Sequence, residues 1–339
     1  MIPAAKNFDP SQSPELLEGW MLGQINSVRP HDGGSSGAQK FVIDSAEGRF
    51  LLKGRPVGSL SPERLELMRQ VTADCIEAGV PVADFRPQAD GQRHVQWGGF
   101  VWELQSWISG RNGRRASDDA ISSGIALAMF HRATRQRQGP IEKGYHHRQD
   151  LDKLARLALS HAPQAESALC ALVTIAKVAR SKVQDRGIAV HRKQALHGDW
   201  HPRNLRFNAQ GQVCGILDLD AVRTDAVATE LATAVLHVSL RRSRDTPTEH
   251  WPEGLRYKAG QRLTSAWRSR IGQEPGLGTW GMLPWLMIEA LAFETILPIA
   301  VRGEIAGIDP AAWIQAGAKS AEWIRERSRA LADCLAPKR

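Results

Sequence analysis

The first hundred residues alternate short apolar runs with polar turns, which is the pattern of antiparallel strands. Residues 41–44 and 49–53 flank the polar stretch 45–48, so the sequence predicts a pair of strands there. Residues 101–110 form a further apolar run that ends in small residues and predicts another strand. We therefore expect a small antiparallel sheet at the front of the chain.

One helix is predicted within this strand-rich part. Ser61 offers a capping hydroxyl and Pro62 favours the first helical turn, while residues 79–81 carry the Gly and Pro that end a helix. The apolar positions between them share one helical face: Leu65, Met68, Val71 and Cys75.

From residue 117 onward the apolar spacing is helical. Residues 121–130, 151–159 and 169–183 each predict a helix, and the last hundred residues continue this pattern with many tryptophans, most of which we expect to be core packing. The longest apolar stretch, 283–301, is interrupted by Glu289, Glu294 and Pro298. It therefore predicts a buried helix and not a membrane span.

A second hairpin interrupts the helical region. Residues 204–207 and 213–217 flank the polar loop 208–212, which contains a glycine and has hairpin chemistry. If the second strand continues, Asp218 and Asp220 share one of its sides, because alternate side chains along a strand point the same way. Either acid could then face a common ligand.

Length and composition indicate an ordinary enzyme. The 339 residues are enough for two domains, and a hydrophobic content of 42% is enough for their cores. The four cysteines are scattered without paired spacing, which argues against a disulfide framework and a zinc site and favours a reducing compartment. The chain opens without a charged and apolar leader, so we expect a cytoplasmic protein with no membrane partner.

The net charge of +8 raises the question of nucleic acid, but the basic residues are dispersed. The two clusters, 111–115 and 241–244, are more typical of solvated loops than of a polyanion site. We expect no nucleic-acid partner, and salt-dependent binding to duplex or single strands would contradict this. The sequence gives no indication of oligomeric state.

The strongest chemical signal lies in residues 197–204, which read His-Gly-Asp-Trp-His-Pro-Arg-Asn. Asp199 is followed five positions later by Asn204, and Asp218 comes after the next apolar strand. Moving a phosphoryl group from a nucleotide to a hydroxyl needs a metal held by oxygen ligands and an acid that orients the hydroxyl. Asn204 and Asp218 fit the first task as Mg²⁺ ligands, and Asp199 fits the second. We favour scaffolding roles for His197 and His201.

The same residues resemble the aminoglycoside phosphotransferase and choline kinase family, which includes a homoserine-kinase-like branch. Residues 196–204 and 215–219 carry this resemblance. It implies an α+β, two-lobed protein-kinase-like fold with a small antiparallel front lobe and a larger helical back lobe. We set these lobes at residues 1–107 and 108–339. The resemblance also implies ATP or GTP with Mg²⁺ and a small hydroxylated acceptor, with Asp199 as the catalytic aspartate.

Lys53 ends an apolar strand in the predicted sheet, where kinases place the lysine that pairs with phosphate oxygens. Kinase-like folds hold this lysine with an acid on the following helix, where Glu63 and Glu66 are candidates, and we select Glu66. The position at which the family tends to carry Glu holds Met68, so the chain departs from the pattern here.

The nucleotide site is less sharply marked. Ser35 and Ser36 lie in a glycine-rich turn whose amides could cradle phosphate, although the turn matches no phosphate-binding motif. The backbone near Ser106 and Ile108, at a strand end, could hydrogen-bond a purine because strand ends leave donors and acceptors unpaired. These features do not separate adenine from guanine.

Two acids in the apolar stretch 283–301 are candidates for the acceptor site, because the resembling family builds its acceptor pockets from this region. Glu289 and Glu294 could bind an amine or a hydroxyl, and a buried acid is costly unless it is paired. Glu230 takes the place of the family's usual Asp and is expected to stabilise the catalytic loop through backbone contacts.

The sequence therefore predicts a small-molecule kinase. The acceptor could be an amino alcohol, a sugar or an aminoglycoside-like compound, because specificity lies in contacts that no spacing rule reveals. The alternative is a catalytically silent kinase-like protein that binds ligands or regulates others.

Overall fold

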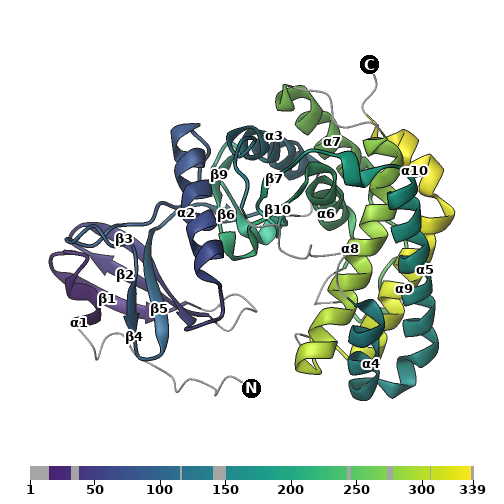
Figure 1. Ribbon diagram of the computed structural model, residues 1–339, viewed down its shortest axis with the longest axis horizontal. Helices are drawn as coiled ribbons and strands as arrows, with labels where there is room; N and C mark the ends of the chain where they lie inside the picture. The colour runs from purple at the N-terminus through teal and green to yellow at the C-terminus, as the bar shows by residue number, and fades with distance from the viewer. Residues whose placement is uncertain are drawn as a thin grey trace.

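The computed structural model describes residues 15–31, 38–114, 117–139, 150–242, 246–272, 278–305 and 307–336. The chain forms a sheet-rich front lobe and a larger, mainly helical back lobe (Figure 1). This confirms the predicted α+β, two-lobed architecture.

A five-stranded antiparallel sheet makes the front lobe, with strand order β1-β2-β3-β5-β4. The strands are β1 (Ile25–Pro30), β2 (Gln39–Ser45), β3 (Gly48–Pro56), β4 (Val95–Trp97) and β5 (Phe100–Ser106). Register pairs Lys40 of β2 with Lys53 of β3, and Lys53 with Glu103 of β5. Paired residues share a face, so these three charged side chains form a row across the sheet.

The opposite face of the sheet is apolar. Phe50 and Leu52 of β3 lie in a small core that α1 (Glu15–Glu18) covers with Leu16 and Leu17. Gly54 lies opposite Trp102 in the register, and a Cβ atom at Gly54 would come within 2.5 Å of the indole ring. A glycine is needed there because the tryptophan ring occupies the space of a side chain.

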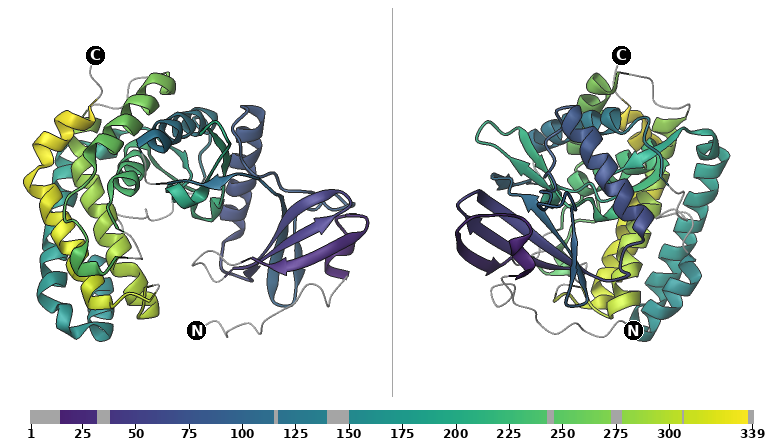
Figure 2. Two further views of the ribbon diagram at one scale, coloured as in Figure 1. Left: turned by 180° about the vertical axis from the view of Figure 1, so that it is seen from behind. Right: turned by 60° about the vertical axis from the view of Figure 1, so that its left-hand side comes forward.

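Helix α2 (Pro62–Glu77) follows the sheet and begins as predicted, with Ser61 as its cap and Oγ accepting from the N–H of Arg64 at 3.3 Å. Its apolar face does not join the sheet's core. Leu67, Met68, Val71 and Cys75 belong to the large core of the back lobe. Figure 2 shows α2 from two further sides, between the sheet and the back lobe.

Two small sheets of short strands flank the predicted catalytic loop. One sheet has the order β6-β8-β9, from β6 (Arg111–Asn112), β8 (Leu205–Phe207) and β9 (Val213–Ile216), and β8 and β9 form the predicted hairpin. The second pairs β7 (Lys193–Leu196) with β10 (Arg223–Ala226) in antiparallel register. The loop 197–204 thus runs from β7 to β8.

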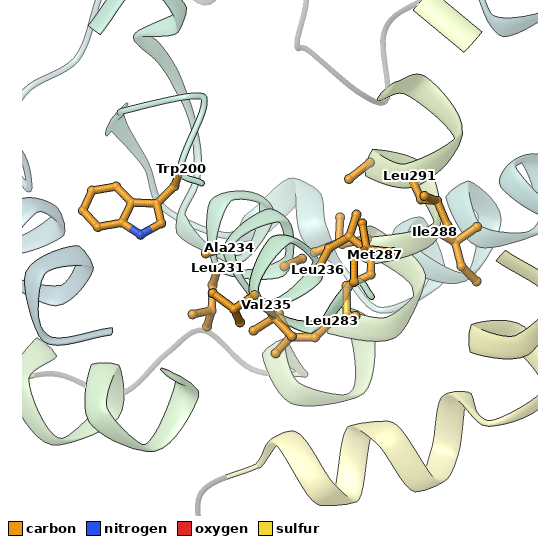
Figure 3. Close-up of a cluster of buried hydrophobic side chains, with 14 of the residues drawn as sticks. Trp200, Leu231, Ala234, Val235, Leu236, Leu283, Met287, Ile288 and Leu291 are labelled. Carbon is orange, nitrogen blue, oxygen red and sulfur yellow. The ribbon is translucent and has the colours of Figure 1, made fainter. Parts of the chain in front are cut away.

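Helices complete the back lobe. They are α3 (Ser117–Ala133), α4 (Leu151–His161), α5 (Glu166–Asp185), α6 (Val227–Ser239), α7 (Tyr257–Ile271), α8 (Thr279–Arg302), α9 (Pro310–Glu326) and α10 (Ser328–Leu335). Figure 3 shows α6 and α8 meeting in the core, with Leu231, Val235 and Leu236 from α6 and Leu283 and Met287 from α8.

Helix α8 contains the predicted buried stretch. Within the described residues it is the one helix long and apolar enough to cross a membrane, and 72% of its most apolar window is buried inside the protein. It packs against α4, α5, α6, α9 and α10. The structure therefore accounts for its hydrophobicity as core packing, as Glu289, Glu294 and Pro298 indicated.

Candidate active site

Asp199 and Asn204 meet within the loop between β7 and β8. The Nδ2 group of Asn204 donates to the backbone oxygen of Asp199 at 2.9 Å and to its Oδ2 at 3.0 Å. A 3₁₀ turn, Pro202–Asn204, closes the loop, and the N–H of Asn204 donates to His201 O at 3.0 Å. The five-residue spacing thus brings an amide against a carboxylate, and the Oδ1 atom of Asn204 takes no part in these bonds.

Gly198 fixes the path of the chain just before Asp199. Its φ of 86° lies in the left-handed region, and an added Cβ atom would come within 1.9 Å of the backbone oxygen of Ala221. No other residue fits both the conformation and the space. Arg223 secures the same peptide, because its Nη1 donates to Gly198 O at 2.8 Å.

Glu230, in the first turn of α6, hydrogen-bonds the start of the loop. Its carboxylate accepts from the backbone N–H of His197 at 3.2 Å, from that of Gly198 at 2.5 Å and from Nε2 of His131 at 2.8 Å. Trp267 donates Nε1 to Nδ1 of His131 at 3.0 Å, so the His131 proton lies on Nε2. These are the backbone contacts predicted for Glu230.

The environment keeps Glu230 ionised. Burial favours its neutral form, but the hydrogen bond from His131 and the charges around it hold the pKa of Glu230 below its ordinary value. An ionised carboxylate is the stronger acceptor for the two loop amides.

His197 connects the Asp199 loop to the Asp218 loop. Its Nδ1 accepts from the N–H of Asp199 at 3.2 Å, so its Nε2 carries the proton and donates to Leu217 O at 2.9 Å. The N–H of Leu217 in turn donates to Asn204 O at 2.8 Å. Asp218 is therefore held beside Asn204 by its neighbour in the chain, and His197 has a scaffolding role.

Strand β9 ends at Ile216, two residues before Asp218. Asp218 has a φ of 64°, in the left-handed region that few non-glycine residues adopt, and a 3₁₀ turn, Leu219–Ala221, follows. The strand therefore does not continue to Asp220, and alternation does not explain why Asp218 and Asp220 lie together. The sharp turn brings both acids toward the front lobe.

Lys53 contacts both acids. Its Nζ lies 2.7 Å from Oδ1 of Asp218 and 2.8 Å from Oδ2 of Asp220, and its side chain is 2% exposed. It lies inside β3, which extends to Pro56, and not at the end of a strand as predicted.

The structure corrects the predicted partner of this lysine. Glu66 is more than half exposed and accepts from Gln70 Nε2 at 2.9 Å, near Arg69, so it does not hold Lys53. Met68 occupies the position expected for the acid and is fully buried in the back-lobe core. An apolar side chain there cannot form the expected ion pair, and the acids that contact Lys53 come from the back lobe instead.

Three charged residues of this site were missed from the sequence. Arg55 contacts Asp220 at 2.7 Å and pairs with the buried Glu103, and Lys40 Nζ lies 3.4 Å from Oδ2 of Asp218. A signal was present, because charges at Lys40, Arg55 and Glu103 interrupt apolar strands at positions that share one face. Only the strand register shows that they converge.

These cations set the charge of the two acids. Burial raises the pKa of Asp218, but Lys53 and Lys40 outweigh it and hold the pKa below the usual range. The pKa of Asp220 is likewise lowered, against burial, by Lys53 and Arg55. Both acids are ionised near neutral pH.

Asp199 faces a different set of groups. His201 Nε2 lies 3.4 Å from its Oδ2, and the rings of His201 and His237 meet edge to face with centroids 5.6 Å apart. His237 of α6 is itself 3.1 Å from Oε1 of Glu294 on α8. Burial opposes ionisation, but His201 and the neighbouring imidazoles hold the pKa of Asp199 well below its usual range.

The two acids of α8 have different surroundings. Glu294 joins the chain of groups that leads to Asp199, whereas Glu289 is 2% exposed and neither of its oxygens has a hydrogen-bond partner among the described residues. Burial, together with the nearby Asp225 and against the attraction of Arg180, raises the pKa of Glu289 to about 7. Of the two predicted candidates, Glu294 is the one linked to the catalytic loop.

The predicted nucleotide contacts are placed in part. The N–H of Ser106 already donates to Asp84 O at 2.9 Å, so it is not free for a purine. Ile108 packs its side chain against Gly215. Ser35 and Ser36 lie outside the described residues.

The oxygen atoms in this site suit a magnesium ion. Asp218 offers an ionised carboxylate, and Asn204 offers an amide oxygen that its own hydrogen bonds leave unused. Mg²⁺ prefers such oxygen ligands and keeps several waters, so two protein ligands are enough beside a nucleotide. The residues therefore fit the group that the sequence implied.

Comparisons with known proteins identify the family and the fold of this chain. The model of the phosphotransferase enzyme family matches residues 27–270, and no curated protein matches the sequence. A microcompartment-associated aminopropanol kinase has a TM-score of 0.70 at 18% identity, over 96% of this chain and 99% of that one. A choline kinase from Streptococcus pneumoniae has a TM-score of 0.60 at 13% identity, over 93% and 100% of the chains.

A third structure, an amicoumacin kinase in complex with AMP-PNP and Ca²⁺, has a TM-score of 0.63 at 12% identity and covers 96% of this chain and 94% of that one. At these identities the similarity shows a shared fold.

Proposed function

The chain belongs to the phosphotransferase enzyme family and is a small-molecule O-phosphotransferase, and we propose that it transfers the terminal phosphoryl group of ATP, or of GTP, to a hydroxyl of a small alcohol. The observation that carries this proposal is that the Asp199–Asn204 pair is hydrogen-bonded, through Asn204 O and Leu217 N–H, to the segment that carries Asp218, and that Lys53 of the front lobe contacts Asp218. A structural neighbour that holds AMP-PNP and Ca²⁺ supports the choice of a nucleoside triphosphate with a divalent cation.

Asp199 acts on the acceptor. Because its carboxylate is ionised, it can accept a hydrogen bond from the acceptor hydroxyl and orient that oxygen toward the terminal phosphorus. As the new P–O bond forms, the hydroxyl proton moves to Asp199, and the bond from the phosphorus to the leaving diphosphate breaks. His201 holds the carboxylate in place at 3.4 Å.

The other residues position and neutralise phosphate, which is most of what phosphoryl transfer asks of a protein. Asn204 and Asp218 would hold Mg²⁺, which when bound neutralises charge on the phosphate oxygens. Lys53 supplies a buried ammonium group for the same oxygens, while Asp220 fixes its direction at 2.8 Å.

The acceptor belongs to the class of amino alcohols, sugars and aminoglycoside-like compounds. Glu294 adds negative charge next to His237 on the acceptor side of Asp199, which favours an acceptor that carries an amine. We place the enzyme in the cytoplasm, acting on a nucleotide and a small molecule and not on nucleic acid or membranes.

Incubation of the purified protein with Mg²⁺, ATP and metabolite pools tests the proposal, with mass spectrometry detecting products heavier by one phosphoryl group. Asp199→Asn is the matched control, because asparagine keeps the size of the side chain and one hydrogen-bond-accepting oxygen. Its amide cannot take up the proton of the acceptor hydroxyl as a carboxylate can. We expect product with the wild type and none with a folded Asp199→Asn variant.

The rival interpretation is a silent ligand sensor with the same fold. It predicts nucleotide binding without a phosphorylated product across the whole acceptor panel. A protein that binds no nucleotide would contradict both interpretations.

A further inference from the structure

We propose that Lys40 is a second phosphate-binding lysine, which pairs with Asp218 in the free enzyme and moves to the nucleotide's phosphates when Asp218 takes up the metal. This inference rests on the proposed kinase function. It goes beyond it by assigning a substrate contact to a residue of β2, in addition to Lys53 of β3.

The position of Lys40 is the first support. Its direct register partner is Lys53, so the two side chains lie next to each other on the same face of the sheet. Like charges that lie directly opposite each other in neighbouring strands destabilise a sheet, unless a nearby anion compensates them. Here that anion is Asp218, 178 positions along the chain from Lys40.

Burial is the second support. The Lys40 side chain is only 10% exposed. Lysine is rarely so buried unless its charge is compensated, and its Nζ lies 3.4 Å from Oδ2 of Asp218. The ammonium group is therefore held inside the site.

The two lysines differ in the acids that remain paired with them when Asp218 binds a metal. Lys53 keeps Asp220, whose Oδ2 is 2.8 Å away, and Asp220 is held in turn by Arg55. Among the described residues, Asp218 is the one acid that pairs with Lys40. Metal binding therefore removes the partner of Lys40 while the anchor of Lys53 stays, and the nearest compensating charge is the phosphate that arrives with the metal.

This exchange predicts opposite effects of Lys40 on the binding of metal alone and on the binding of nucleotide. In the free enzyme Lys40 competes with a metal ion for Asp218, because both are cations and the carboxylate carries one charge. In the nucleotide complex the same lysine favours binding, because it donates to phosphate oxygens. Removing its charge should therefore strengthen the binding of bare metal and weaken the binding of the nucleotide, and a purely structural lysine would not produce these opposite signs.

The test compares the wild type with Lys40→Met, Lys40→Arg and Lys177→Met. Lys177 is the matched control, since it also pairs with a carboxylate, Asp152 at 2.8 Å, but lies exposed on the surface. Calorimetry measures the affinity for AMP-PNP with Mg²⁺, and electron paramagnetic resonance measures the affinity of the nucleotide-free protein for Mn²⁺.

We expect Lys40→Met to bind AMP-PNP roughly tenfold more weakly, as for the loss of one charge-assisted hydrogen bond, and to bind Mn²⁺ alone more tightly than the wild type. Lys40→Arg should recover most of the AMP-PNP affinity, and Lys177→Met should match the wild type. If Lys40→Met does not fold, Lys40→Gln is measured in the same way, with the same expected signs.

Equal affinities in Lys40→Met and the wild type, or a loss of both affinities together, would overturn the inference. In that case the wild type still binds AMP-PNP and forms product, so the proposed kinase function stands. A wild type that binds no AMP-PNP overturns both.

Discussion

Nζ of Lys53 lies 2.7 Å from Oδ1 of Asp218, so a strand of the front lobe is tied directly to the loop that follows β9 in the back lobe. The lysine is inside the protein, and its two carboxylate partners come from one short turn.

The first prediction concerns this pair. Lys53→Met should lower kcat by about a hundredfold or more, because a fixed charge at the transferring phosphoryl group is lost. Steady-state kinetics measures this, and Lys319→Met, at an exposed surface ion pair, is the control.

Glu230 should be essential to folding and not to chemistry. Glu230→Ala leaves the His131 Nε2–H and two loop amides buried without their acceptor, which we expect to cost about 3 kcal/mol or more of unfolding free energy. Urea denaturation measures the change. Glu77→Ala, at an exposed position in α2, should shift the free energy only slightly. Comparable losses in both variants would contradict a role for Glu230 as the loop's acceptor.

Glu289 should make stability fall as pH rises. Its pKa is about 7 in the folded protein against 4.5 ordinarily, so between these values the folded state holds a proton that the unfolded chain has released. The unfolded state binds fewer protons there, and the free energy of unfolding therefore decreases as pH rises through that window.

Glu289→Gln removes this titration. The variant should be more stable than the wild type at pH 8, by on the order of 2 kcal/mol, and the difference should shrink toward pH 5. Urea denaturation of both proteins across this range checks it, and the comparison cancels the other titrating groups. Parallel stability curves would show that Glu289 is ionised throughout.

His237 should affect the acceptor and not the nucleotide. It lies between His201, which contacts Asp199, and Glu294 of α8, whereas the lysines contact Asp218 and Asp220. His237→Ala should reduce kcat/KM for the acceptor about tenfold and leave KM for ATP nearly unchanged. His250→Ala, at an exposed position, serves as the control. An equal rise in both KM values would remove His237 from the acceptor side.

The catalytic loop was predictable because its geometry is local. Asp199 and Asn204 are five positions apart, Gly198 allows the turn, and the hairpin that leads to Asp218 has its own sequence signal. The helices and the first hairpin follow from periodicity in the same way. The assignment of Lys53 also came from its strand, although β3 extends three residues beyond it.

The partners of Lys53 could not be predicted because they depend on contacts between lobes. The expectation of Glu66 assumed that α2 presents an acid to the sheet. The apolar face of α2, which includes Met68, packs in the core of the back lobe instead. Asp220 reaches the lysine only because Asp218 adopts a left-handed conformation that ends the strand. No local pattern reports such a turn when the residue is not glycine.

The position of α2 has a mechanical consequence. Its apolar residues belong to the back-lobe core, which is separate from the core beneath the sheet. The sheet is therefore joined to the rest of the protein at the site chiefly through ionic links, from Lys40, Lys53 and Arg55 to Asp218 and Asp220. Moving the sheet away from the back lobe would break these ion pairs, so a ligand that neutralises their charges also changes how firmly the sheet is held there.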